Sequence, residues 1–263
     1  MNDNTSRTPP LLNENIPGLP PLLNDDMPRL PPLLNDNMPG LPPMLNDNSP
    51  RLLPLLIDMN GRKVVIFGGG QVGERKAALF SRYAPTTVIS RSFTPAIQEL
   101  GRQGVCLVNT GGELSDDEIA LYVRDAFLVI PTTSDLELNR RIRDVAHNND
   151  CLVNSVNGLE DLVVPSIIER GDIILAISTG GASPALSRYM RQKIEQAIGP
   201  QFEDMARLLG EIRPVLKKEV GSQANRSSIL WAILEDKDVW KALAESYELA
   251  FDIALKHITN GVK

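Results

Sequence analysis

The chain has 263 residues, of which 42% are apolar and 23% charged, and its formal net charge at neutral pH is −6. This length suits one large or two small domains, and the composition excludes a collagen, a coiled coil or a wholly disordered chain. A net negative charge argues against general binding to nucleic acid or to an anionic membrane. No apolar run approaches the roughly 20 residues that span a bilayer, and no signal-peptide pattern is present. We therefore expect a cytoplasmic protein.

The chain contains two cysteines, Cys106 and Cys151. Two thiols cannot build a disulfide framework or the usual zinc cage, so we predict no metal site. Both lie at or beside predicted strands, a placement that favours buried thiols.

Residues 1–51 contain a tandem repeat with a period of eleven. Four copies at 8–51 read TPPLLNENIPG, LPPLLNDDMPR, LPPLLNDNMPG and LPPMLNDNSPR, and a degenerate fifth copy, LLPLLIDMNGR, occupies 52–62. Each of the four copies has a Pro-Pro pair and a further proline, which excludes long helices and central strands. We predict a mostly disordered tail. The alternative is a polyproline-type ligand for a partner protein.

A glycine-rich turn follows the first predicted strand. Residues 63–67 (KVVIF) show no polar alternation, as in a parallel strand that is buried on both faces. The following residues match G-x-G-x-x-G at Gly68, Gly70 and Gly73, and a helical pattern continues to residue 80. Glycines in this setting allow a close approach to a pyrophosphate, and the helix N-terminus supplies free N–H groups. We therefore predict a dinucleotide site, with a turn that binds nothing as the alternative.

The second predicted strand, at 86–90, departs from the usual NAD pattern. That pattern has an acidic residue for the ribose about 20 residues past the glycines, but this strand ends in Ser90, Arg91, Ser92 and Phe93. Arg91 offers a positive charge that suits a 2′-phosphate. The residues alone therefore leave both NAD and NADP open.

Further strands and helices alternate along the chain. We predict strands at 105–109, 126–130 and 152–156, and helices at 95–101, 116–123 (capped by Ser115) and 136–148. This alternation indicates a Rossmann-like parallel sheet with right-handed crossovers. The strand at 126–130 leads into a polar loop that includes Thr132 and Thr133. Because a sheet of this type binds its ligand at the carboxyl ends of its strands, we assign both threonines to the cofactor site.

A second glycine turn follows a strand predicted at 172–178. Ser183 is a good N-cap and Pro184 suits the first position of a helix that ends near residue 198. Every fourth residue of this helix is apolar, which predicts a core stripe. The stripe consists of Leu186, Met190, Ile194 and Ile198. The turn at the helix N-terminus suits an anion, and an ordinary strand–helix turn is an equal alternative.

Four segments taken together resemble one family. They are GRKVVIFGGGQVGERKA (61–77), PTTSDLELNRRI (131–142), VPSIIERGDIILAISTGGASPALSRYMRQKIE (164–195) and the helical tail with Arg226 and Trp231. The resemblance is to the precorrin-2 dehydrogenase / sirohydrochlorin ferrochelatase family of siroheme biosynthesis, and it extends from about residue 53 to the C-terminus. The STGGASP turn, at this distance from the glycine-rich loop, is its most specific part.

The resemblance implies NAD-dependent oxidation of precorrin-2 to sirohydrochlorin by a homodimer, with insertion of Fe²⁺ in some members. It implies that Gln71, Val72, Ser92 and Phe93 contact the cofactor, and it favours NAD over NADP. The substrate carries several carboxylates, so the second glycine turn and nearby cations are assigned to it. This substrate set consists of Ser178, Thr179, Gly180, Ser183 and Arg188. Further candidate cations are Arg140, Arg141, Arg143 and Arg191.

One position departs from the family's pattern. The resemblance implies a catalytic aspartate just after the strand predicted at 152–156, but this chain has Asn157 there. An amide cannot act as a carboxylate base, and metal insertion requires removal of two pyrrole protons, so chelation should suffer most. Hydride transfer depends mainly on positioning and is expected to survive. Glu160 and Asp161 are candidate replacements, with solvated loop charge as the alternative.

We predict four segments in order along the chain. They are a repeat tail at 1–51, an NAD-binding domain at 52–163, a small α+β dimerisation unit at 164–199 and a helical domain at 200–263. We expect a tetrapyrrole substrate and no nucleic-acid or membrane partner. A non-catalytic NAD-binding partner protein of the same pathway is the competing hypothesis. A nucleotide-sensing regulatory domain of the type attached to transporters is a third, and the STGGASP turn argues against it.

Overall fold

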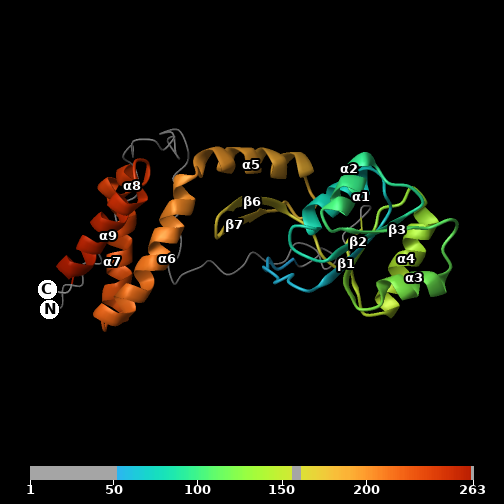
Figure 1. The fold of residues 1–263 in the computed structure, drawn as a ribbon, viewed down its shortest axis with the longest axis horizontal. Coiled ribbons are helices and arrows are strands. Elements are labelled where there is room, and N and C mark those ends of the chain that lie inside the picture. The colour runs from blue at the N-terminus through green and yellow to red at the C-terminus, as the bar shows by residue number, and fades with distance from the viewer. Residues whose placement is uncertain (1–51, 156–160, 262–263) are drawn as a thin grey trace, which may run out of the picture. The chain divides into compact units, whose positions relative to one another are not determined.

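The computed structural model describes residues 52–155 and 161–261 (Figure 1). Its contacts divide the chain between Val164 and Pro165 into two compact units. The repeats at 8–51 lie outside the described residues, so both interpretations of them remain predictions. Within the described residues, no helix is long and apolar enough to cross a membrane.

The first unit is built on a five-stranded parallel sheet, which confirms the predicted fold class. The spatial order is β3-β2-β1-β4-β5. The strands are β1 (Lys63–Phe67), β2 (Thr86–Ser90), β3 (Cys106–Asn109), β4 (Ala126–Pro131) and β5 (Leu152–Val153). The chain runs outward from β1 to β3 and then returns to the other side of β1 at β4. The sheet therefore has its topological switch point between β1 and β4, where sheets of this type bind ligands.

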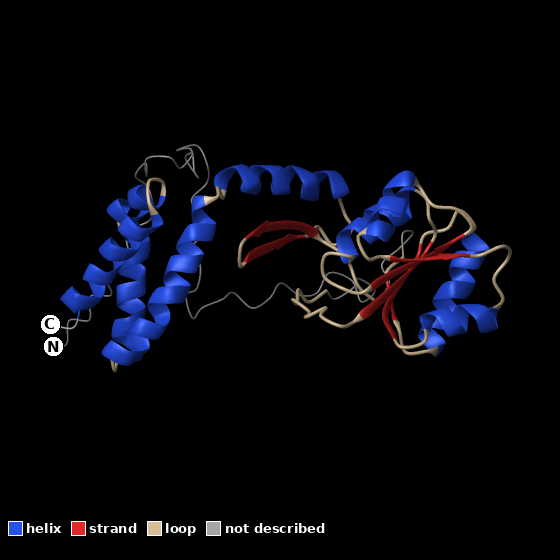
Figure 2. Cartoon of the chain, in the orientation of Figure 1, coloured by secondary structure: helices blue, strands red, loops and turns tan. Residues whose placement is uncertain are grey.

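Helices cover both faces of this sheet (Figure 2). The helices α1 (Gln71–Phe80) and α2 (Pro95–Arg102) pack on one face, and α3 (Asp116–Val123) and α4 (Leu136–Asn148) pack on the other. In β1, Val64 and Ile66 join the core beneath α1 and α2, whereas Val65 and Phe67 join the core beneath α3 and α4. Both faces are buried, and this is why the strand shows no polar alternation.

Several local predictions in this unit can be compared with the structure. Ser115 Oγ accepts the Glu118 N–H and the Glu118 carboxylate accepts the Ser115 N–H, so α3 begins with a capping box. The strand expected at 152–156 is shorter, because β5 ends at Val153 and only the N–H of Asn154 continues the pairing, to Val129 O. Cys151 is buried as expected, but Cys106 is exposed because the first residue of β3 points its side chain toward solvent.

The second unit begins with a β-hairpin, and the sequence analysis did not predict the first of its two strands. The strands β6 (Ser166–Arg170) and β7 (Ile173–Ile177) pair antiparallel. Gly171 has φ +53°, the left-handed conformation that a two-residue hairpin turn needs and that glycine adopts without strain. The Gly171-Asp172 pair between two β-branched runs was the sequence signal for this hairpin.

The prediction that an apolar stripe of α5 (Pro184–Ala197) is buried in the core is wrong for the described residues. Leu186 and Met190 are 47% and 40% exposed, Ile194 and Ile198 are half-buried, and Ser187 is the buried residue of the helix. The physical reason is that a two-stranded hairpin covers only one side of the helix. Ser187 faces that side and lies 3.1 Å from Thr179 Oγ1.

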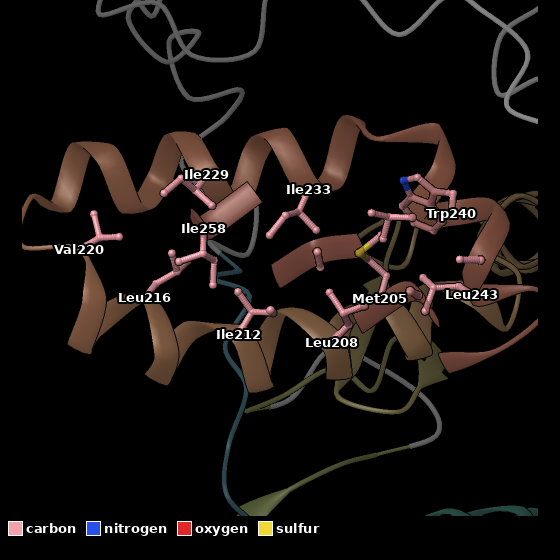
Figure 3. Packing of buried hydrophobic residues seen from close by; sticks show 14 residues of the cluster. Met205, Leu208, Ile212, Leu216, Val220, Ile229, Ile233, Trp240, Leu243 and Ile258 are labelled. Atoms are coloured by element: carbon pink, nitrogen blue, oxygen red, sulfur yellow. The ribbon is translucent and has the colours of Figure 1, made fainter. Parts of the chain in front are cut away.

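The remaining helices share a separate apolar core (Figure 3). They are α6 (Gln201–Glu219), α7 (Gln223–Glu235), α8 (Lys237–Leu243) and α9 (Tyr247–Gly261). In α6, Met205, Leu208, Ile212 and Leu216 are fully buried, and their spacing of three and four residues places them on one helix face. This helical C-terminal region agrees with the predicted class.

Candidate cofactor site

A cavity with a volume of about 820 Å³ lies at the carboxyl ends of β1, β2, β3 and β4. It is bordered by the loop after each of these strands and by the first turn of α1. The cavity therefore lies at the switch point of the sheet, where the sequence predicted a dinucleotide.

Three glycines pack the loop between β1 and α1 so tightly that a side chain has no room. A Cβ added to Gly69 would lie 2.1 Å from Ser92 O, and one added to Gly73 would lie 1.9 Å from Gly68 O. Gly68 has φ +120°, and its Cβ would lie 2.6 Å from Thr132 O. These contacts are with backbone atoms that cannot move aside, so the loop requires glycine for its own packing.

Gly70 differs from these three because no described residue lies within 4 Å of the place that its Cβ would take. Gly70 is the N-cap of α1, it lines the cavity, and no side chain caps the helix. The N–H groups of the first helical turn therefore face open space at the positive end of the helix dipole. This cradle fits the pyrophosphate of a dinucleotide, so the residues present suit the cofactor that the motif predicts.

The loop after β2 forms one border of the cavity. Ser90 Oγ accepts the N–H of Gly69 at 2.9 Å, and Gly69 O accepts the N–H of Thr94 at 3.1 Å. Ser92 and Phe93 line the cavity beside Arg91. The two loops are thus joined by hydrogen bonds, which fixes the position of the residues that follow β2.

The loop after β4 forms the opposite border. Thr132 donates both its N–H and its hydroxyl to Phe67 O, at 2.7 and 2.9 Å. The Thr133 hydroxyl donates to Asn139 Oδ1 at 2.7 Å, and the Asn139 amide donates back to Thr133 O at 2.9 Å. Asp135 caps α4 through the N–H groups of Glu137 and Leu138. The polar loop is therefore rigidly held against β1 and α4.

The cavity brings together eight of the nine residues predicted for the cofactor. They are Gly68, Gly70, Gln71, Val72, Ser92, Phe93, Thr132 and Thr133. Gly73 lies behind them, where it allows α1 to pack on Gly68. Sequence reasoning missed the loop after β3, which contributes Thr110, Gly112, Glu113 and Leu114. The missed signal was a Thr-Gly-Gly run directly after a predicted strand.

The residues assigned to substrate lie in the second unit. Gly180 and Gly181 have positive φ, and Ser178 Oγ accepts the Gly180 N–H at 3.1 Å. Thr179 Oγ1 accepts the Ser183 N–H at 3.1 Å, and Ser183 Oγ caps α5 through Leu186 N. These side chains order the turn after β7. Arg188 follows on α5 with an exposed side chain.

Most of the other candidate cations already have acidic partners. Arg141 binds Asp116 Oδ1 through two N–H groups at 2.9 and 2.7 Å, and it also donates to Leu114 O at 2.8 Å. Arg143 lies 3.2 Å from Asp144. Two further pairs are Arg140 with Glu137 and Arg191 with Glu195, at 2.8 and 2.9 Å. Arg141 nevertheless lines the cavity.

The predicted catalytic positions are only partly described. Asn157 and Glu160 lie outside the described residues. Asp161 is described, and its Oδ2 accepts the Val153 N–H at 2.7 Å and lies 3.0 Å from His147 Nε2. Across 52–155 and 161–261, no group of three or more His, Cys, Asp or Glu side chains is arranged to hold a metal.

A lysine on α1 reaches the same region. Lys76 Nζ donates to Asn154 Oδ1 at 2.6 Å, and Asn154 Nδ2 donates to Leu162 O at 3.1 Å. Burial, and then the charge of Arg75, lower the pKa of Lys76. Sequence reasoning missed this link, because α1 and the segment after β5 are far apart along the chain.

Comparison with known proteins agrees with this site. A family model described as NAD(P)-binding matches residues 55–166, and one described as sirohaem biosynthesis protein central matches residues 170–197. A precorrin-2 dehydrogenase of Methanosarcina barkeri is 49% identical over 204 residues, covering 77% of this chain and 91% of that protein. The chain belongs to the precorrin-2 dehydrogenase family.

Other members and relatives differ in length from this chain. A siroheme synthase of Sodalis glossinidius is 34% identical over 168 residues, which cover 63% of this chain but only 35% of that longer protein. The solved structure of SirC, a precorrin-2 dehydrogenase, is 23% identical with a TM-score of 0.61, and the match covers 80% of this chain and all of SirC. The SirC match establishes a shared fold across both units of this precorrin-2 dehydrogenase family member.

Proposed function

We propose that this protein oxidises precorrin-2 to sirohydrochlorin with NAD⁺ in siroheme biosynthesis. The observation that supports this most strongly is the glycine cradle at the switch point, in a chain that is 49% identical to a precorrin-2 dehydrogenase. The oxidation removes one hydride and one proton from the substrate. NAD⁺, when bound, supplies the hydride acceptor.

The chain's own residues hold and orient the cofactor. The first turn of α1, with Gln71 and Val72, would bind the pyrophosphate through backbone N–H groups and the helix dipole. Ser92 and Phe93 would contact the adenosine side, and Thr132 and Thr133 would border the nicotinamide side. Because the hydride moves directly between two bound molecules, such positioning accounts for most of the rate gain.

Substrate recognition is proposed for the turn after β7. Precorrin-2 is a polycarboxylate, and Ser178, Thr179, Gly180 and Ser183 form a glycine turn at the start of α5 that suits an anion. Arg188, exposed on the second turn of α5, would pair with a substrate carboxylate. Fe²⁺ insertion would be weak, because Asn157 has no proton-accepting carboxylate and the Asp161 carboxylate already binds Val153 N–H.

An anaerobic turnover assay tests the proposed activity. We expect that mixing the protein with precorrin-2 and NAD⁺ produces NADH and sirohydrochlorin in equal amounts, followed by absorbance. Binding of NAD⁺ is measured in parallel by calorimetry. If NAD⁺ binds and neither product forms, the protein is not the enzyme, and the competing hypothesis of a non-catalytic partner protein takes its place.

The exposed apolar side of α5 supports a homodimer, and we propose separately that the protein acts in the cytoplasm. Leu186, Tyr189 and Met190 are 47%, 57% and 40% exposed, and Ile174 of β7 is 45% exposed. Leu186, Tyr189 and Met190 share one helix face by their spacing of three and four residues, and such exposed apolar side chains favour association because their burial removes apolar area from water.

Met190→Glu is expected to convert the dimer into a monomer, because the interface would have to bury an unpaired charge. Light scattering after size-exclusion chromatography measures the mass. Gln192→Glu adds the same charge at an exposed position outside the apolar stripe of α5 and should leave the dimer intact. A wild-type monomer, or a Met190→Glu protein that stays dimeric, would refute the proposed interface.

A further inference from the structure

Two arginines line the cofactor cavity, and they differ in what they bind. Arg141 is held by Asp116 and by Leu114 O through three hydrogen bonds, so its charge is already balanced. Arg91 is exposed, and no ion pair or hydrogen bond of its guanidinium is found within the described part of the chain. Its backbone carbonyl accepts a hydrogen bond from the Asn109 amide. Arg91 therefore carries a charge at the cavity that residues 52–155 and 161–261 leave unbalanced.

The position of Arg91 is fixed by the fold. It is the first residue after β2, and the residues on both sides of it are tied to the glycine loop. Ser90 Oγ accepts the Gly69 N–H at 2.9 Å, and Gly69 leaves room for Ser92 O only because it has no Cβ. In parallel dinucleotide-binding sheets, the end of this strand contacts the adenosine ribose.

The acidic side chains of the cavity lie at other borders. Asp135 caps α4, Glu137 pairs with Arg140, and Glu113 follows β3. None of them occupies 90–93, where an acidic residue would bind the free 2′-hydroxyl of NAD and repel a phosphate. The ribose end of β2 thus combines a cation with two serines and lacks the carboxylate that discriminates against a 2′-phosphate.

We propose that Arg91 forms a binding site for the 2′-phosphate of the adenosine ribose, so that the protein accepts NADP⁺ as well as NAD⁺. A guanidinium binds phosphate with two parallel N–H donors, and it keeps its charge at all physiological pH values. This inference rests on the proposed cofactor site and extends it to the phosphorylated dinucleotide. NAD⁺ needs no contact with Arg91 and retains the pyrophosphate cradle at Gly70.

Calorimetry with adenosine fragments tests Arg91 without any turnover. The probes are adenosine 2′,5′-bisphosphate and 5′-AMP, which differ only in the 2′-phosphate. We expect the bisphosphate to bind wild-type protein about tenfold more tightly or better, as is typical for hydrogen bonds to a charged group. Arg91→Ala should abolish this advantage while 5′-AMP binds as before. Raising the salt concentration should weaken the binding of the bisphosphate more than the binding of 5′-AMP.

The matched control is Arg102→Ala, which removes another exposed arginine of the same unit that pairs with Glu99 outside the cavity. Arg102→Ala should leave the affinities for both fragments unchanged. Full-length NADP⁺ and NAD⁺ should repeat the pattern, with only NADP⁺ sensitive to Arg91→Ala.

Three results would overturn the inference, and they separate it from the proposed function. Equal affinities of the two fragments for wild-type protein would show that no 2′-phosphate site exists. If Arg91→Ala weakened the binding of both fragments equally, Arg91 would act through its general positive charge and not through the 2′-phosphate. Failure of every adenosine compound, NAD⁺ included, would refute the cofactor site and with it the proposed function.

Discussion

Gly70→Ala should abolish most NAD⁺ binding in a protein that still folds normally. The backbone of Gly70 is extended, at φ −86° and ψ −171°, which alanine adopts freely. Within the parts of the chain that the structure describes, no atom lies within 4 Å of the new methyl group, so the apo fold has room for it. The methyl group would occupy the space of the pyrophosphate. We expect a loss of about 10- to 100-fold in affinity, corresponding to roughly 1–3 kcal/mol of steric cost.

The comparison that isolates this effect is Gly210→Ala. Gly210 lies inside α6, far along the chain from the cavity, and here too no described residue comes within 4 Å of the Cβ position. Alanine there should stabilise the protein by about 0.5–1 kcal/mol and leave NAD⁺ binding unchanged. Calorimetric titration and thermal unfolding of both variants provide the measurements. Undiminished NAD⁺ affinity in Gly70→Ala would mean that the pyrophosphate does not approach this turn.

Asn157→Asp should give the largest gain of function, in metal insertion. Chelation must remove two pyrrole protons, and a carboxylate at this position would accept them where an amide cannot. General-base catalysis contributes about 10²- to 10⁴-fold, so Fe²⁺ or Co²⁺ insertion into sirohydrochlorin should rise by that order. Dehydrogenation by the same variant should change little, because hydride transfer depends on positioning. Both rates are measured anaerobically on the same preparation.

Glu160→Gln provides the matched test of a neighbouring carboxylate. If the wild-type protein already inserts metal rapidly and Glu160→Gln abolishes the insertion, then Glu160 has taken over the role of the missing aspartate. The proposal for Asn157 would also be refuted if Asn157→Asp left chelation unchanged. A loss of dehydrogenation in Asn157→Asp would contradict the separation of the two steps.

The first unit, which contains the five-stranded sheet, could be predicted because the sequence patterns of its strands and helices are local. The β1 strand reads as apolar without alternation, and its two faces do pack under two pairs of helices. Ser115 and Ser183 were recognisable as helix caps because a cap depends on neighbouring residues alone. Boundaries that depend on distant partners were harder to predict, and β5 ended early for that reason.

The exposure of the α5 stripe was not predictable from periodicity. A spacing of four residues shows that Leu186 and Met190 share a helix face, but it does not show what covers that face. The hairpin beneath α5 is too small to cover more than one side. The β6 strand was missed although a glycine turn marked it, because its run of five residues alternates weakly.

One topological rule predicted where the cofactor residues after the strands would meet, but it could not predict the side chains that reach the site from helices. All carboxyl ends of a parallel sheet meet at one edge, so residues after β1, β2 and β4 were expected to converge there. Arg141 reaches the cavity from α4, and its restraint by Asp116 of α3 depends on helix packing that no local pattern encodes. The link between Lys76 and Asn154 has the same origin.

That link has an evolutionary consequence for residues 155–160. Asn154 before this segment is held by Lys76 and by Leu162 O, and Asp161 after it is held by Val153 N–H. The side chains in these anchors, Lys76, Asn154 and Asp161, all belong to the unit that contains the five-stranded sheet. The residues that carry these anchors differ from residue 157, so a lineage can gain or lose a proton acceptor at that position while it keeps the anchoring side chains themselves.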